Sequence, residues 1–139
     1  MKRVAGFTII ELMIVVAVLT VILALAIPSF MTARKAAAET KAKTRLRSSV
    51  TLSEQYHSRF RTYSPSLSEM IHAGLTLDYD IDPQSAYVFS YSGSASTWTM
   101  NGDPRTPGKT GDNYFYADQT GVIRFSSSGQ ADASSQPIE

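Results

Sequence analysis

An almost unbroken apolar run near the N-terminus constrains this chain more than any other feature. The run extends from Phe7 to Ile27 and ends at Pro28. That length is close to the ~20 residues that an α-helix needs to cross the hydrocarbon core of a bilayer. One carboxylate, Glu11, interrupts the run. A carboxylate costs about 2.5–3.5 kcal/mol in the middle of a membrane, so Glu11 is expected to have a partner and to mark a functional site.

Three interpretations compete for this segment. An ordinary membrane anchor accounts for its length but leaves Glu11 unexplained. A secretory signal peptide would use Lys2 and Arg3 as its basic end and the Ala24-Leu25-Ala26 segment as its cleavage site, but it would have to accommodate the acid. The third interpretation treats residues 6–12, GFTIIEL, as a single motif.

That motif resembles the start of type IV prepilins and of the related pseudopilins. These proteins begin with a short basic leader, followed by Gly, Phe, Thr, a hydrophobic pair, Glu and Leu, and they carry a proline where Pro28 stands. The resemblance covers residues 3–30. It implies that a membrane-embedded prepilin peptidase cuts between Gly6 and Phe7 and methylates the new amine of Phe7. It also implies that Glu11 helps to assemble subunits into a filament on an inner-membrane platform.

The residues themselves suggest how the acid would act after such a cut. Cleavage after Gly6 would place an ammonium group on Phe7, four residues before Glu11 and on the same helical face. In an apolar environment the two charges, on the same or adjacent subunits, would relieve each other's desolvation. Between subunits they would fix the axial register, as a buried polar residue does in a coiled coil. We therefore assign assembly and register to Phe7 and Glu11.

The length of the chain permits one domain behind this segment. The expected parts are a cleaved leader at 1–6, a membrane or filament-core helix at 7–28, and a helix-plus-sheet domain at 29–139. Pro28 lacks an amide hydrogen, so a kink is expected there. A single helix is predicted from about 7 to about 60. Its buried face in the domain shares three- or four-residue spacing and comprises Ala38, Ala42, Leu46, Val50, Ser53, Tyr56 and Phe60.

Downstream of residue 60 the pattern changes. Capping-box spacing predicts a short helix at about 66–73. Four short stretches of period two then predict strands, at 86–92, 97–101, 114–118 and 122–126. Residues 103–113 are expected to form an exposed loop, and the polar tail from 126 to 139 is expected to be flexible. The predicted fold class is α+β and pilin-like, with a four-stranded antiparallel sheet on the C-terminal half of the long helix.

The charges argue against one class of function, and they conflict with the motif over the orientation of the chain in the membrane. The chain has 13 basic and 12 acidic residues and a formal net charge of +1, which argues against a dedicated nucleic-acid-binding protein. Six basic residues between 34 and 47 would put the domain in the cytoplasm by the positive-inside rule, whereas the prepilin resemblance puts it outside. This basic cluster is either a solvated face or faces acidic groups of a neighbouring subunit or anionic headgroups.

No catalytic pattern is apparent. The sequence lacks zinc spacing, a phosphate loop and a nucleophile elbow, so neither an enzyme nor a cofactor is expected. His57 and His72 are expected to be packing or surface residues. Asp78, Asp80 and Asp82 alternate in a way compatible with calcium, but no Gly or closing Glu follows, so a solvated loop edge is favoured. There is no cysteine, so no disulfide can close a C-terminal loop, as one does in many pilins.

The leading functional hypothesis is a structural subunit of a type IV pilus, a helical polymer of itself. Such a chain would reside in the inner membrane with its domain on the periplasmic side, and then in a cell-surface filament. Two alternatives stay open. One is a major-type pseudopilin of a type II secretion system, with a periplasmic filament; the segment 103–111 only loosely resembles the calcium loop of that group. The other is a membrane-anchored binding module.

Overall fold

The structure is a computed structural model that describes residues 6–75 and 85–138. The aspartates proposed as weak metal candidates, Asp78, Asp80 and Asp82, lie outside the described residues. The chain divides into two compact units, Met1–Arg34 and Lys35–Glu139.

One long helix, α1, runs from Ile9 to Phe60 and contributes to both units. The prediction of a helix from about 7 to about 60 is therefore confirmed, with a start two residues later than expected. Pro28 lies inside α1, and the hydroxyl of Thr32 donates a hydrogen bond of 3.1 Å to the Pro28 carbonyl oxygen. The kink at Pro28 remains a prediction.

In the second unit, α1 buries one face at the predicted spacing. The buried side chains recur every three or four residues and comprise Ala42, Leu46, Ser49, Ser53 and Tyr56. Phe60 was predicted to lie on this face, but its side chain is 44% exposed. Phe60 is the last residue of α1, and Arg61 turns the chain away with a φ of 60°. The ring of Phe60 instead lies against the ring of Tyr56, with 4.5 Å between their centroids.

The sheet of the second unit is antiparallel and follows chain order. Its strands are β1 (Tyr87–Gly93), β2 (Trp98–Pro104), β3 (Tyr114–Asp118), β4 (Ile123–Ser126) and β5 (Gln136–Pro137). The α+β fold class is confirmed, and the four predicted strands are present. The predicted number of strands is corrected, because β5 adds a fifth on the outer edge of β4. A strand of two residues is too short to produce a period-two pattern.

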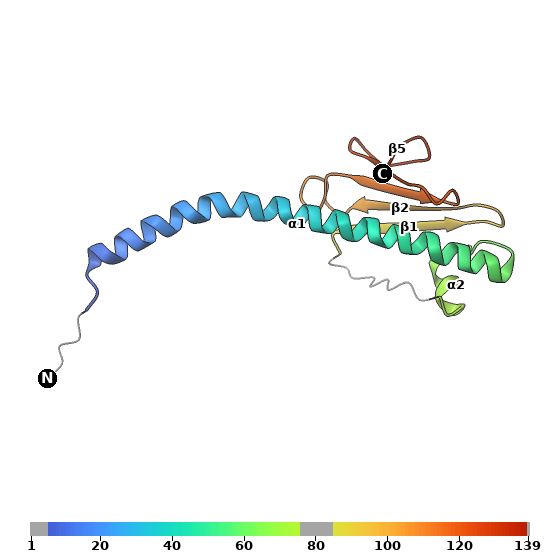
Figure 1. Ribbon diagram of the computed structural model, residues 1–139, viewed down its shortest axis with the longest axis horizontal. Coiled ribbons are helices and arrows are strands. Elements are labelled where there is room, and N and C mark those ends of the chain that lie inside the picture. The colour runs from blue at the N-terminus through green and yellow to red at the C-terminus, as the bar shows by residue number, and fades with distance from the viewer. Residues whose placement is uncertain (1–5, 76–84, 139) are drawn as a thin grey trace. The chain divides into compact units, whose positions relative to one another are not determined.

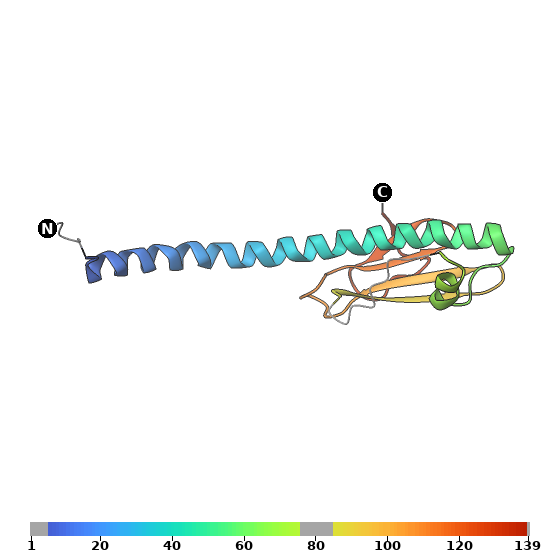
Figure 2. The same cartoon turned by 90° about the horizontal axis from the view of Figure 1, so that it is seen from below.

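The core lies between α1 and one face of the sheet. Figures 1 and 2 show the second half of α1 running along β1 and β2. Leu46 of α1 is fully buried together with Met100 of β2 and Phe115 of β3. The chain's only tryptophan, Trp98, is 1% exposed at the start of β2. Alternate residues of the strands thus supply the apolar face that the period-two pattern predicts.

Residues 126–138 of the tail are held by hydrogen bonds to the sheet, contrary to the expectation of a flexible segment. Ala131 is 2% exposed, and its carbonyl oxygen accepts a hydrogen bond of 2.9 Å from the Asn101 side chain. Arg124 donates a hydrogen bond of 3.0 Å to the Ser135 carbonyl oxygen. The backbone amide of Ile138 donates to the Ile123 carbonyl oxygen at 2.8 Å. These partners lie far away in the sequence, so local polarity could not reveal the order of the tail.

The short helix α2 (Leu67–His72) is confirmed, with Ser66 as its N-cap. The hydroxyl oxygen of Ser66 accepts a hydrogen bond of 3.3 Å from the Glu69 amide. His72 lies in the last turn of α2, and the His57 ring stacks on Tyr63 with 4.4 Å between centroids.

The loop predicted at 103–113 is shorter than expected, because β2 continues to Pro104 and Gly111 is buried. Residues 105–109 are exposed. Glu39 of α1 fixes the far end of this loop, because its carboxylate accepts hydrogen bonds from the Asp112 amide (2.9 Å) and the Asn113 side chain (3.0 Å).

Candidate functional site

The predicted cleavage point lies just before the helix. Gly6, Phe7 and Thr8 are exposed and precede α1, which begins at Ile9. The side chain of Phe7 is 85% exposed. A β-carbon built on Gly6 would meet nothing within 4 Å, so packing among the described residues does not require glycine there. The Gly6–Phe7 peptide is therefore outside regular structure and open to another molecule.

Glu11 has a hydrogen-bond partner within the chain, namely Thr8. The Glu11 carboxylate accepts from the Thr8 amide at 2.9 Å and from the Thr8 hydroxyl at 2.8 Å. The Glu11 amide in turn donates to the Thr8 hydroxyl oxygen at 3.3 Å. This reciprocal arrangement is a capping box, in which the first residue before a helix and the third residue within it satisfy each other's amides.

Thr8 is a residue that the sequence interpretation missed, although its signal was present. The spacing Thr8-Ile9-Ile10-Glu11 is the same Ser/Thr-x-x-Glu pattern that identified the cap of α2. The sequence instead predicts a partner of opposite charge for Glu11, namely the amine of Phe7. In the uncut chain the nitrogen of Phe7 is a peptide amide, so the structure shows the state before that amine exists. The pairing of Phe7 with Glu11 stays a prediction.

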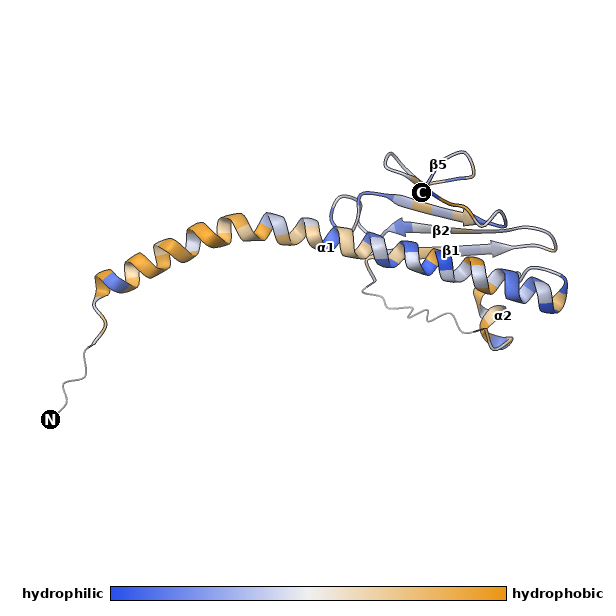
Figure 3. Cartoon of the chain, in the orientation of Figure 1, coloured by the Kyte–Doolittle hydropathy of each residue, from blue (hydrophilic) through white to orange (hydrophobic). Residues whose placement is uncertain are grey.

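The first half of α1 presents apolar side chains on all sides. Its large hydrophobic residues from Ile9 to Met31 are between 48% and 82% exposed. Figure 3 shows this part of α1 as an almost continuous hydrophobic band. Among the residues that the structure describes, α1 is the one helix long and apolar enough to cross a membrane. So much exposed apolar surface requires a cover, which a bilayer or other apolar helices can provide.

The threonine hydroxyls within and at the end of this apolar band bond to carbonyl oxygens of the same helix. Thr20 donates a hydrogen bond of 2.8 Å to the Ala17 carbonyl oxygen, and Thr32 bonds to Pro28 as described above. Glu11 is the single charged residue between Phe7 and Ile27. A shallow apolar hollow of about 390 Å³ lies on one side of the helix, with Ile14, Val18 and Ile22 among its walls. Hollows of this kind can receive the side chains of a second helix.

Several residues of the basic cluster have partners inside the second unit. Lys35 forms an ion pair with Asp112 at 3.0 Å. The Lys43 ammonium lies 5.5 Å from the centre of the Phe115 ring, at cation–π distance. The Arg45 guanidinium is equally placed over the Phe89 ring, at 5.5 Å. Three others, Arg34, Lys41 and Arg47, are exposed. The cluster is therefore partly a solvated face and partly a contribution to packing.

No group of three or more His, Cys, Asp or Glu side chains that could hold a metal ion occurs among residues 6–75 and 85–138. The three aspartates at 78, 80 and 82 fall outside those ranges. A metal site at these three aspartates therefore remains a weak prediction from the sequence.

Comparison with known proteins adds two findings. Residues 1–27 match the family model described as the prokaryotic N-terminal methylation motif. The chain is also 31% identical over 100 residues to the type IV wide pilus major component PilA4 of Thermus thermophilus. That similarity covers 72% of this chain and 73% of the relative, so it extends well beyond the N-terminal motif into the helix-plus-sheet domain.

Proposed function

This chain belongs to the type IV pilin and pseudopilin family, and we propose that within the family it is a structural subunit of a type IV pilus. The observation that carries the proposal is the N-terminal segment. A single carboxylate lies near the start of an exposed apolar helix, directly after an accessible Gly6–Phe7 peptide. The similar Thermus protein is described as a major component of a wide pilus, which favours a pilus over a secretion pseudopilus.

In the proposed mechanism the helix passes through two environments. The apolar band of α1 first lies in the inner membrane, with the second unit on the periplasmic side. Prepilin peptidase removes residues 1–6 and methylates Phe7, which leaves an ammonium group at the new N-terminus. On the assembly platform the band then leaves the lipid and packs against the helices of other copies. Apolar burial is thus retained, while the lipid is replaced by protein.

Removal of the leader makes this transfer possible. Lys2 and Arg3 would otherwise accompany the N-terminus into the filament core, where unpaired charges cost several kcal/mol each. After cleavage one ammonium group remains, and Glu11 supplies one carboxylate. Only one stagger of neighbouring helices brings these charges together, so the pair would select the correct register. Family members of this kind are structural proteins, and the proposal assigns no catalytic role to the chain.

The mass of the mature N-terminus tests the first step. The full chain is expressed in a host that has its own prepilin peptidase, and the N-terminal peptide is analysed by mass spectrometry. A peptide that begins with methylated Phe7 is expected. A start at Ile27 would indicate a signal peptide and an intact Met1 a plain anchor, and either result would overturn the proposal. A Gly6→Val variant is the matched control, because a β-carbon at residue 6 meets nothing within 4 Å in the described chain and the substitution should block only cleavage.

Imaging of cells tests the second step. Deletion of this chain is expected to remove surface filaments, and the wild-type gene is expected to restore them. Surface filaments that persist without the chain, together with loss of protein secretion, would assign it to a pseudopilus. The two experiments are independent, since a pseudopilin would also carry methylated Phe7.

A further inference from the structure

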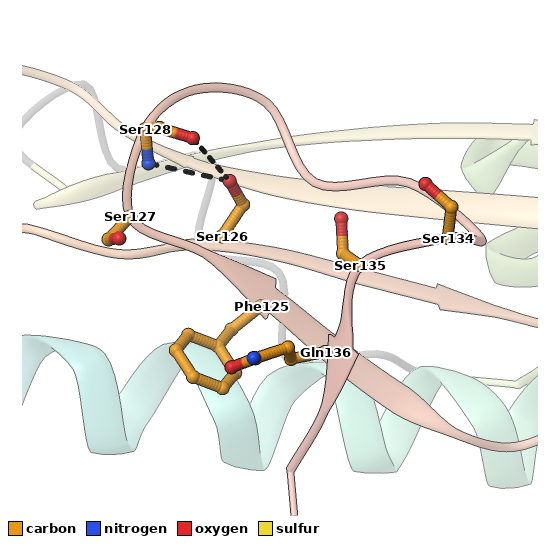
Figure 4. A pocket seen from close by; sticks show the side chains of 7 residues that line it. All are labelled: Phe125, Ser126, Ser127, Ser128, Ser134, Ser135 and Gln136. Atoms are coloured by element: carbon orange, nitrogen blue, oxygen red, sulfur yellow. Dashed lines mark hydrogen bonds between the residues drawn. The ribbon is translucent and has the colours of Figure 1, made fainter.

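A hollow lined by hydroxyl groups lies between the end of β4 and the start of β5. Its volume is about 320 Å³, at the lower end of the ~300–1,000 Å³ that small-ligand sites occupy. Figure 4 shows the lining, with Ser126–Ser128 on one segment and Ser134 and Ser135 on the other. Phe125 and Gln136, which are directly paired in the β4–β5 register, complete it. None of these lining side chains is ionisable.

Most of the hydroxyl groups are held in place by neighbouring groups. The Asp132 carboxylate accepts from the Ser134 hydroxyl at 2.7 Å and from the Ser135 hydroxyl at 3.1 Å. The Ser128 amide donates to the Ser126 hydroxyl oxygen at 3.4 Å. The Ser135 hydroxyl oxygen also accepts from the Asp132 amide at 3.0 Å. Because a hydroxyl oxygen has two acceptor lone pairs, each of these two serines keeps at least one that can accept from a ligand. The hydroxyl bonds from Ser134 also keep the pKa of Asp132 below its usual range, so the carboxylate stays ionised.

The chemistry of the lining selects a class of ligand. A pocket with fixed hydroxyl acceptors and a primary amide suits a molecule that carries many hydroxyl groups of its own. The lining holds no Lys, Arg or His side chain, and the guanidinium of Arg124 already donates to the Ser135 carbonyl oxygen at 3.0 Å. The Asp132 carboxylate that faces Ser134 would in addition repel an anion. A cation would find the carboxylate oxygen that faces the serines already accepting hydrogen bonds from Ser134 and Ser135. A neutral polyhydroxylated ligand therefore fits best.

We propose that this serine-lined hollow binds a neutral saccharide. The serine oxygens of Ser134 and Ser135 accept from sugar hydroxyl groups, and Ser127, which is exposed, both donates and accepts. The Gln136 amide adds a donor and an acceptor at the other wall. The site is open rather than enclosed, so the expected affinity is modest, in the range of free sugar binding to a shallow surface. The inference does not depend on whether the chain builds a pilus or a pseudopilus.

Binding is tested with the full chain in a detergent that has no sugar headgroup, by saturation-transfer NMR and titration. The probes are a neutral glucose trisaccharide, a neutral N-acetylglucosamine trisaccharide and a sialylated trisaccharide of similar size. We expect a saturation-transfer signal and a saturable titration for at least one neutral probe, and a weaker signal for the sialylated probe. A neutral glucose polysaccharide is the further arm, and its binding would show that the hollow accepts internal sugar units rather than chain ends alone. Absence of binding by every neutral probe would overturn the proposal, as would a preference for the charged one.

Paired variants locate the binding. The double variant Ser127→Ala with Ser128→Ala is expected to weaken the titrated affinity roughly tenfold, because two neutral hydrogen-bonding groups are removed. The matched control, Ser90→Ala with Ser92→Ala, changes two exposed serines of β1 and should leave the affinity unchanged. Trp98 fluorescence checks that both variants keep their fold. Equal affinity of the two double variants would place any binding elsewhere and refute the site.

Discussion

Thr8 provides Glu11 with a partner that a single chain can supply before any assembly. Both the amide and the hydroxyl of Thr8 donate to the carboxylate, at 2.9 and 2.8 Å. Hydrogen bonds to the charged form offset part of the cost of placing an acid at the start of an apolar helix. In the proposed mechanism the new amine of Phe7 then becomes a second, stronger partner for the same carboxylate. In this proposal Thr8 satisfies Glu11 while the helix is in the membrane, and Glu11 acquires its register function only after cleavage.

The variant Glu11→Ala tests this division of roles. Insertion and cleavage are expected to remain close to wild type, because the apolar run is lengthened rather than broken. Assembly is expected to fall at least about tenfold, since the partnerless ammonium of Phe7 would cost several kcal/mol in a packed bundle. The measurement compares the chain in sheared filaments with the chain in membranes. Leu12→Ala, which removes no charge, is the control, and a normal filament yield from Glu11→Ala would refute the register role.

Gly93 ends β1 at a point where another segment passes very close. A β-carbon built there would overlap the backbone carbonyl oxygen of Ser64, in the connection between α1 and α2. Gly93→Ala is therefore expected to destabilise the second unit by about 2 kcal/mol or more, because the backbone itself must shift. Gly129→Ala is the matched control, since a β-carbon there meets nothing within 4 Å. Urea titration followed by Trp98 fluorescence measures both, and equal midpoints would contradict the close approach.

At the scale of elements, the residue directly after α1 has a backbone conformation that is strained for its type. Arg61 has a φ of 60°, and its amide donates a hydrogen bond of 2.8 Å to the His57 carbonyl oxygen. This is the left-handed position after a helix that glycine usually occupies. Arg61→Gly is expected to stabilise the second unit by about 0.5–1 kcal/mol, after the greater freedom of glycine in the unfolded chain is subtracted.

The control variant for Arg61→Gly is Arg59→Gly, which lies two residues earlier in the last turn of α1. The Arg59 guanidinium donates a hydrogen bond of 3.1 Å to the Ala73 carbonyl oxygen after α2. Glycine in a helix also costs roughly 0.5–1 kcal/mol relative to alanine. A lower urea midpoint is therefore expected for Arg59→Gly and a higher one for Arg61→Gly. Lower midpoints for both would show that the strain at residue 61 is not relieved by glycine.

The elements that could be predicted from the sequence are those with a local pattern. The periodic face of α1, the cap at Ser66 and the four longer strands each depend on residues within a few positions of one another. The fifth strand and the ordered tail do not, because Asn101 and Arg124 hold residues 131 and 135 from distant strands. Phe60 was misassigned because periodicity cannot show where the sheet stops covering a helix. The capping role of Thr8 is visible in the sequence as the Thr-x-x-Glu spacing, which the expectation of a charged partner for Glu11 does not use.

At the scale of the whole molecule, the chain combines a helix segment that requires an external cover with a unit that has its own core. The apolar band up to Met31 is exposed, whereas the second unit buries Trp98, Phe115 and Leu46. Stability of the second unit can therefore be measured separately from assembly. Without cysteine, that stability comes from packing and hydrogen bonds, including those that Glu39 accepts from the end of the β2–β3 loop.

Buried and partly buried tyrosines make the stability of this unit sensitive to alkali. Burial, and then the nearby charges of Glu39 and Asp112, raise the pKa of Tyr87 far above its usual value, while its hydroxyl donates to the Asn113 carbonyl oxygen at 2.7 Å. Burial also raises the pKa of Tyr91 and of Tyr116. In the unfolded chain these phenols ionise at about pH 10. The stability from these groups is thus complete below pH 10 and declines as the pH rises toward the folded-state pKa.

For Tyr87 this loss is expected to reach up to about 1.4 kcal/mol per pH unit above pH 10. Tyr87→Phe removes both the ionisation and the hydrogen bond to Asn113, so it should be about 1 kcal/mol less stable at pH 8 yet lose less stability between pH 10 and 11. Urea unfolding monitored by Trp98 fluorescence at pH 8, 10 and 11 measures the two slopes. Phe125→Leu, which changes a partly covered ring of β4 and removes no ionisable group, should keep the wild-type slope. Parallel pH profiles for the wild type and Tyr87→Phe would show that the buried Tyr87 phenol does not govern the alkaline limit of the fold.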